Sequence, residues 1–247
     1  MKAKLRAWLR WTVVVLLGLG VTFYAWTQDT YAVDPIAYAS ALADGRVRIE
    51  ERRGYIVMKP AVGEARRALL FYPGLRVDPK AYVPKLAEVA VATQIEIVVG
   101  RPRLNVAAFS ISQADDMRNV LSHPAQTQVY VGGHSLGGAM ACLFAQGHAA
   151  ELAGIVLFGT YCGSDIVNSQ LRILNLIAAK DVIMPAETIE QHRAELPIDA
   201  LVVRVPGMRH SQFGNYGAQR GEDPADIDDG QARDAIVSAM NSFFASR

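Results

Sequence analysis

Short apolar runs that alternate with helical patterns are the feature that most constrains the fold of this chain. The runs are residues 68–72, 95–99, 129–131, 155–158, 173–178 and 201–203, and helical patterns occupy residues 79–90, 112–122, 136–146 and 234–244. Strands that are apolar at every position are typical of a parallel sheet covered by helices on both faces. Residues 34–45 predict a short helix before the sheet, and residues 47–50 and 55–58 predict a hairpin. We therefore predict an α/β fold with a mostly parallel central sheet, whose carboxyl edge binds ligands.

Length and charge limit the number of domains and the kind of partner. The chain has 247 residues, with 25 basic and 24 acidic residues and a net charge of +1. If residues 1–30 serve targeting, residues 31–247 are enough for one domain with a full core. Because no basic stripe is present, we expect no nucleic-acid partner. No cluster of cysteine and histidine predicts a metal site, and the oligomeric state is left open.

The first thirty residues have the pattern of a membrane segment. Four cations and no acid precede an uncharged stretch, residues 11–28, and aromatic residues flank its apolar centre, residues 13–21, on both sides. Such belts are typical of membrane helices. The apolar run is intermediate in length between a cleaved signal and a full span, but bulky residues stand where a cleavage site would be. We therefore expect an uncleaved signal anchor rather than a signal peptide or a buried core helix, with the domain outside the cytoplasm. The four cations are Lys2, Lys4, Arg6 and Arg10, and the flanking aromatic residues are Trp8, Trp11, Phe23, Tyr24 and Trp26.

A glycine-flanked serine lies between the strand at 129–131 and the helix at 136–146. Residues 133–137 read Gly-His-Ser-Leu-Gly, which is the pattern G-x-S-x-G in the context of a strand-to-helix turn. The turn is so sharp that side chains two residues before and after Ser135 would collide, which explains Gly133 and Gly137. Ser135 would present its hydroxyl at a helix N-terminus. We prefer this interpretation to a capping serine or to a dinucleotide loop, whose glycine spacing differs.

The chain resembles the α/β-hydrolase family, and in particular its small, uncapped fold type 5 members, many of which carry an N-terminal membrane segment. The resemblance spans about residues 68–244. It rests on residues 71–74 (Phe-Tyr-Pro-Gly), on residues 133–138, and on residues 210–217 (His-Ser-Gln-Phe-Gly-Asn-Tyr-Gly). It implies a serine hydrolase without a cofactor. Residues 159–171, where such proteins place any lid, leave no room for a sizeable cap domain.

In this fold the acid and then the base follow the nucleophile along the chain. His210 is the one histidine that follows the last predicted strand, so it is the candidate base. Asp181 lies at the carboxyl end of the preceding strand and is the favoured acid. Asp165 is the rival acid and Glu187 a distant third. The backbone N–H of Leu136 should form one half of an oxyanion hole.

The second oxyanion donor should come from the loop after residue 72. Pro73 has no N–H, so Leu75 is the candidate, with Gly74 and Arg76 as alternatives. Cys142 and Cys162 are the only cysteines; we prefer to interpret them as two small buried apolar side chains, although an exported domain could oxidise them.

These residues predict acyl transfer to water through an acyl-enzyme on Ser135, with an ester or lipid-like substrate. Alternatives on the same residues are an amidase or peptidase, an acyltransferase, and a non-catalytic binding protein at the membrane. Acyl length and leaving group do not follow from the sequence.

Overall fold

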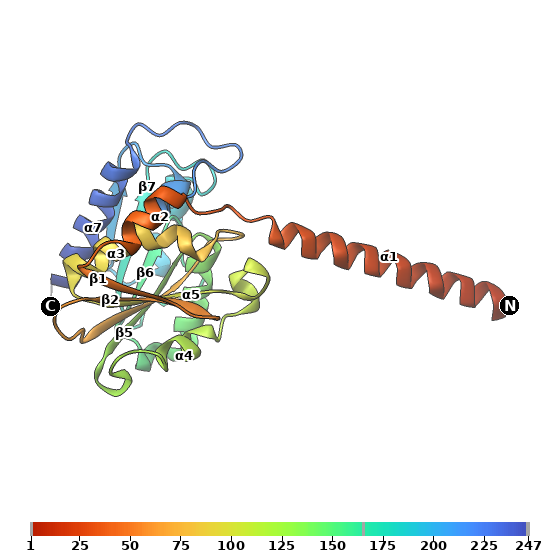
Figure 1. Cartoon of the computed structure of the whole chain (residues 1–247), viewed down its shortest axis with the longest axis horizontal. Helices are drawn as coiled ribbons and strands as arrows, with labels where there is room; N and C mark the ends of the chain where they lie inside the picture. The colour runs from red at the N-terminus through yellow and green to blue at the C-terminus, as the bar shows by residue number, and fades with distance from the viewer. Residues whose placement is uncertain (1, 165, 246–247) are drawn as a thin grey trace.

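Among residues 2–164 and 166–245, which the computed structural model describes, eight strands form one sheet (Figure 1). Their order across the sheet is β1-β2-β4-β3-β5-β6-β7-β8. β1 and β2 are antiparallel to their neighbours, whereas β3 to β8 run parallel, which confirms the predicted hairpin and parallel sheet. The strands are β1 (Val47–Glu51), β2 (Tyr55–Pro60), β3 (Arg67–Tyr72), β4 (Glu96–Gly100), β5 (Gln128–His134), β6 (Gly154–Phe158), β7 (Arg172–Ala178) and β8 (Leu201–Val205).

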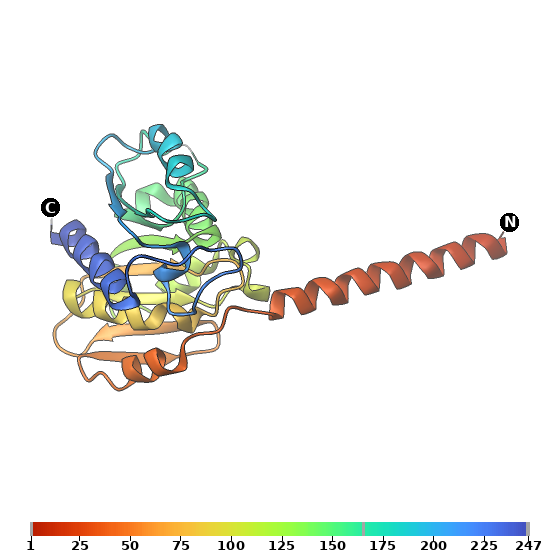
Figure 2. The same cartoon turned by 90° about the horizontal axis from the view of Figure 1, so that it is seen from above.

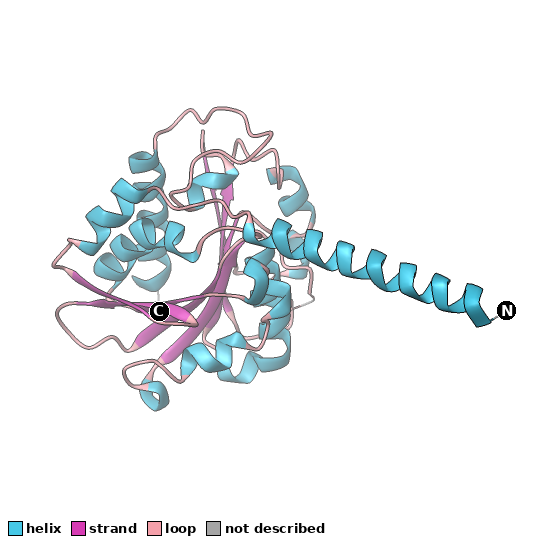
Figure 3. Cartoon of the chain, turned by 45° about the vertical axis from the view of Figure 1, so that its right-hand side comes forward, coloured by secondary structure: helices cyan, strands magenta, loops and turns pink. Residues whose placement is uncertain are grey.

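Helices cover both faces of this sheet (Figures 2 and 3). One buried core joins the sheet to α2 (Pro35–Leu42), α3 (Val83–Thr93) and α7 (Asp229–Ala245). A second core joins the opposite face to α4 (Gln113–Arg118) and α5 (Leu136–His148). Because both faces are buried, the central strands have no polar side to show to water, as their continuous apolar runs predicted.

Three helices differ at their ends from the sequence expectation. The predicted helix at 79–90 begins with a 3₁₀ turn, Pro79–Tyr82, before α3. α4 stops at Arg118, because the chain then turns inward to bury Leu121 and to let the N–H of Ser122 donate to the buried Glu96. α7 begins at Asp229, earlier than expected. Asp228 and Gln231 exchange hydrogen bonds there as a capping pair, which the apolar pattern alone does not reveal.

The N-terminal helix α1 (Lys2–Gln28) projects away from the domain (Figures 1 and 2). Its part Trp8–Gln28 is long and apolar enough to cross a membrane, with a mean hydropathy of 1.5, and none of the hydrophobic window is buried in the protein. The helix is therefore not part of the core. These properties are shared by membrane anchors and signal sequences.

The chain between β6 and β7 is short and carries no cap. Its described residues, 159–164 and 166–171, contain neither a helix nor a strand. The carboxyl ends of β5, β6 and β7 are therefore not covered by a separate domain, as the sequence predicted.

Candidate active site

Ser135 lies on the turn that joins β5 to α5. Its backbone has φ 53° and ψ −125°, a conformation that residues other than glycine rarely adopt. The two flanking glycines are required by contact: a Cβ on Gly133 would lie 2.5 Å from the backbone carbon of Gly137, and one on Gly137 would lie 2.2 Å from the Tyr72 carbonyl oxygen. The turn is thus packed against itself and against the end of β3.

The Ser135 side chain is partly exposed at the carboxyl edge of the sheet. Its backbone N–H donates to the carbonyl of Phe158 at 2.9 Å, which ties the turn to the end of β6. The Ser135 hydroxyl makes no hydrogen bond to another described side chain or backbone group. It therefore stands at the sheet edge without a partner, and a contact with His210 stays a prediction.

Asp181 and His210 form a buried pair. His210 Nδ1 lies 2.5 Å from Asp181 Oδ2, and both side chains are almost completely removed from solvent. The other carboxylate oxygen of Asp181 accepts hydrogen bonds from the backbone N–H groups of Ile183 and Met184, at 2.9 and 2.7 Å. Because three hydrogen bonds fix the Asp181 carboxylate, it can hold the imidazole of His210 in one orientation and leave Nε2 as the reactive nitrogen.

The turn that carries His210 is held by a buried lysine. Lys85 donates to the carbonyls of Gln212 and Gly214 at 2.6 and 2.8 Å, and pairs with Asp229 at 2.8 Å. Burial lowers the pKa of this lysine, although the pairing with Asp229 opposes that effect. One buried side chain of α3 thus joins the His210 turn to α7.

His134 and Tyr82 form a second buried network, which the sequence analysis did not identify. The Gly74 N–H donates to the Tyr82 hydroxyl at 2.9 Å, and the same hydroxyl oxygen forms a hydrogen bond of 2.9 Å with His134 Nδ1, in which the donor depends on the tautomer of the imidazole. Burial, and secondly the nearby His210, lower the pKa of His134 well below its usual value, so the ring stays neutral. Burial also raises the pKa of the Tyr82 phenol. The signal in the sequence was the position of His134 beside the serine.

Two residues, His134 and Gly159, lie between His210 and the turn that carries Ser135. The rings of His134 and His210 lie 4.3 Å apart between centroids. Gly159, directly after β6, has φ +56°, and a Cβ there would lie 3.2 Å from His210 Nδ1. The backbone N–H of Ser135 is hydrogen-bonded to Phe158, and His210 packs on Gly159. Ser135 and His210 therefore both lie at the carboxyl end of β6.

The loop after β3 has three backbone N–H groups that were candidates for an oxyanion hole. Two of them are engaged: Gly74 N–H by the Tyr82 hydroxyl, and Arg76 N–H by the Asn105 carbonyl at 2.9 Å. The N–H of Leu75 has no acceptor among the described residues, and neither has that of Leu136, the first residue of α5. These are the two groups that the sequence nominated.

Of the other two candidate acids, the structure describes only Glu187, and it does not contact His210. Glu187 lies on the surface in α6 (Ala186–Gln191), where it pairs with Arg204 at 3.3 Å. Asp165 lies outside the described residues. Among the described residues, no group of three or more histidine, cysteine or acidic side chains is placed to hold a metal ion.

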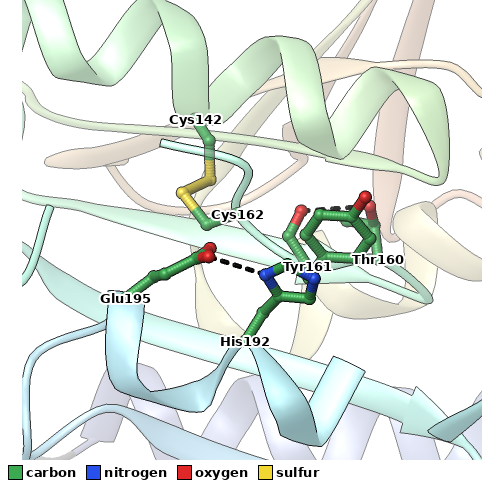
Figure 4. The surroundings of a disulfide bond; sticks show 6 residues. All are labelled: Cys142, Thr160, Tyr161, Cys162, His192 and Glu195. Carbon is green, nitrogen blue, oxygen red and sulfur yellow. Dashed lines mark hydrogen bonds and ion pairs between the residues drawn. A yellow bond between two sulfur atoms is a disulfide. The ribbon is translucent and has the colours of Figure 1, made fainter. Parts of the chain in front are cut away.

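Cys142 and Cys162 form a disulfide, so the expectation of two separate buried thiols was wrong (Figure 4). Their Cα atoms are 5.5 Å apart, because α5 and the loop after β6 pack side by side. The same loop carries Tyr161, whose ring stacks on His192 at 3.9 Å, and His192 Nδ1 lies 2.6 Å from Glu195. Sequence spacing does not indicate this pairing, since only the fold brings the two cysteines together.

Replacing Cys142 and Cys162 together with alanine is expected to lower the free energy of unfolding by about 3 kcal/mol. The disulfide closes a loop with a sequence separation of 20, and removing it frees the unfolded chain. Urea unfolding of the oxidised and the double-alanine protein, each in the same detergent, measures the difference. Equal midpoints with equal slopes would contradict a stabilising disulfide.

Comparison with known proteins supports the fold. A family model described as the alpha/beta hydrolase family matches residues 68–234. Among solved structures, a thermostable esterase from Pseudomonas putida superposes with a TM-score of 0.59 and 16% identity, covering 85% of this chain and 86% of that one. A hyperthermophilic esterase from Pyrobaculum calidifontis gives 0.58 and 14%, covering 90% and 91%.

A third similar structure is an alpha/beta hydrolase enzyme from the metagenome of Lake Arreo, Spain. It has a TM-score of 0.58 and 15% identity, and covers 85% of this chain and 87% of that one. No curated protein matches the sequence. At such identities, the solved structures establish a shared fold.

Proposed function

The chain belongs to the alpha/beta hydrolase family, and we propose that it is a serine hydrolase that cleaves carboxylic esters through an acyl-enzyme. Ser135 is the proposed nucleophile, His210 the base and Asp181 the acid that orients it. The observation that carries this proposal is the buried contact of 2.5 Å between Asp181 and His210, at the sheet edge where the strained turn presents Ser135.

The proposed reaction has two steps. His210 Nε2 takes the proton of the Ser135 hydroxyl while the serine oxygen attacks the ester carbonyl. The N–H groups of Leu136 and Leu75 hold the resulting oxyanion. The alcohol leaves with the proton from His210, and a water molecule activated by the same imidazole releases the acid. Because His134 stays neutral, its ring adds no positive charge beside the imidazolium that forms on His210.

Two observations support an ester as the substrate. Similar structures from Pseudomonas putida and Pyrobaculum calidifontis are esterases, and the described residues between β6 and β7 form no cap that would enclose a particular substrate. The second part of the proposal concerns location: α1 anchors the protein in a membrane, with the domain outside the cytoplasm. The Cys142–Cys162 disulfide supports this, because disulfides persist in oxidising compartments.

A fluorophosphonate probe tests the proposed nucleophile. We expect the full-length protein to be labelled covalently on Ser135, and the Ser135→Ala variant to remain unlabelled. Ser40→Ala, which changes an exposed serine of α2, is the matched control and should label like the wild type. A folded wild-type protein that is not labelled would contradict the proposal and favour a non-catalytic binding role. Comparing a p-nitrophenyl ester with the matching anilide then separates esterase from amidase activity.

A further inference from the structure

The end of α1 is fastened to the loops that border the proposed active site. The Thr27 side chain is buried, and its carbonyl accepts a hydrogen bond of 3.0 Å from the Asn105 side chain, which follows β4. Arg76, which follows β3, pairs with Asp29 at 2.5 Å and places its guanidinium 4.8 Å from the centre of the Trp26 ring. The last turn of α1 therefore cannot swing freely relative to the carboxyl edge of the sheet.

The backbone makes this connection tighter still. Tyr31 pairs with Val77 in a parallel bridge, in which the Tyr31 N–H donates to the Arg76 carbonyl at 2.8 Å. Arg76 is the residue directly after Leu75, the proposed oxyanion donor. Direct hydrogen bonds therefore join the segment after α1 to the loop that carries Leu75, although the two are far apart in the sequence.

A phenylalanine of the domain reaches alongside the apolar helix. The rings of Phe109 and Phe23 meet edge to face, with 6.3 Å between their centroids. Phe23 lies five residues before the end of α1 at Gln28, which corresponds to about 7.5 Å along the helix axis. If α1 spans a bilayer, Phe109 enters that bilayer to the depth of the aromatic belt. Phe109 is 50% exposed and Leu75 is 38% exposed, so both apolar side chains face outward there.

Cations accompany these apolar side chains. A groove of about 630 Å³ beside Phe109 is lined by Arg53, Arg101 and Arg103, with Asp116 as its acid. Arg101 pairs with Glu51 at 2.7 Å, whereas Arg53 and Arg103 have no ion-pair partner among the described residues. Basic side chains next to exposed apolar ones suit the boundary between lipid headgroups and acyl chains.

We propose that this carboxyl edge docks onto the bilayer that holds α1, so that the substrate is an ester lipid of the same leaflet. This inference rests on the proposed function. The ester groups of a glycerolipid lie between its headgroup and its acyl chains, which is the level that Phe109 reaches and close to the loop that carries Leu75. Hydrolysis there breaks the ester C–O bond, transfers the acyl group to Ser135 and then to water, and leaves the remaining alcohol in the membrane.

Depth measurement tests the docking without using catalysis. Because the native cysteines are paired, Phe109→Cys and Val62→Cys each introduce a single thiol for a nitrobenzoxadiazole label. Val62 is 81% exposed and follows β2, at the opposite edge of the sheet, so it is the matched control. Both are made in full-length Ser135→Ala protein, in phosphatidylcholine–phosphatidylglycerol vesicles. We expect nitroxide lipids to quench the label at 109 and not the one at 62; equal quenching at both positions overturns the docking.

A vesicle assay tests the substrate. Wild-type protein should hydrolyse a fluorogenic glycerophospholipid in its own vesicles about tenfold faster or more than in separate vesicles, because shared membrane raises the effective concentration. Equal rates would overturn a substrate taken from the same leaflet. Cleavage of a soluble p-nitrophenyl ester without cleavage of lipid overturns the lipid substrate alone. If neither ester is cleaved, the proposed hydrolase itself fails, while the quenching result still reports on docking.

Discussion

The His210→Ala variant is expected to lose on the order of 10⁶-fold in kcat for a p-nitrophenyl ester. In the proposed mechanism the imidazole takes the Ser135 proton and returns it to the leaving alcohol, so its removal would disable both proton transfers. The loss corresponds to about 8 kcal/mol of transition-state stabilisation. Because the ring is buried beside Asp181, the substitution leaves a cavity that could destabilise the protein. Thermal unfolding is therefore followed first, to show that the variant is folded, and kcat and KM are then measured.

His123→Ala is the control for this prediction. His123 is an exposed histidine before the 3₁₀ turn Pro124–Gln126, and it precedes β5, so it lies at the amino end of the strand whose carboxyl end carries Ser135. We expect its kcat to stay within about twofold of wild type, since surface substitutions change little. A folded His210→Ala protein with wild-type kcat would remove His210 from the mechanism.

Asp181→Asn should lower kcat about 10⁴-fold while the protein stays folded. The amide occupies the space of the carboxylate, but it presents the wrong group to His210 Nδ1 or favours the wrong tautomer. It also no longer stabilises the imidazolium. The backbone hydrogen bonds from Ile183 and Met184 to the remaining oxygen should hold the side chain in place. Steady-state kinetics with a soluble ester give the ratio, and KM should change much less than kcat.

Two further variants decide among the candidate acids. Glu187→Gln removes a carboxylate that pairs with Arg204 on the surface, and should leave kcat unchanged. Asp165→Asn removes the rival acid that the sequence left open. If Asp165→Asn abolishes activity and Asp181→Asn does not, the assignment of the acid is wrong, although the serine and histidine would keep their proposed roles.

Much of the sheet edge could be predicted from local patterns. The continuous apolar runs identified the parallel strands, because full burial on two faces leaves no place for polar residues. Residues 133–137 predicted a sharp strand-to-helix turn, since glycine is the side chain that such contacts admit, and Gly137 indeed lies against the Tyr72 carbonyl. The charge pattern and hydropathy of residues 1–28 predicted a long apolar helix outside the core.

Other features depend on contacts between distant segments. Three sets of contacts join residues that are far apart in the chain. They are the Cys142–Cys162 disulfide, the hydrogen bonds among Gly74, Tyr82 and His134, and the hydrogen bonds from Lys85 to the turn that carries His210. No local pattern specifies such partners, because each depends on how α3, α5 and the loops pack once the sheet has formed. Helix ends behaved in the same way: α4 stops where Leu121 finds a buried site.

The sequence by itself determined two features: Ser135 lies on a sharp strand-to-helix turn, and a long apolar helix precedes the domain. Both follow from side-chain size and hydrophobicity along a short stretch of the chain. Only the tertiary structure decided which carboxylate meets His210, which N–H groups of the loop after β3 are left free, and that the end of α1 is tied to that same loop. Those outcomes depend on distances of a few ångström across the fold, which no one-dimensional pattern carries.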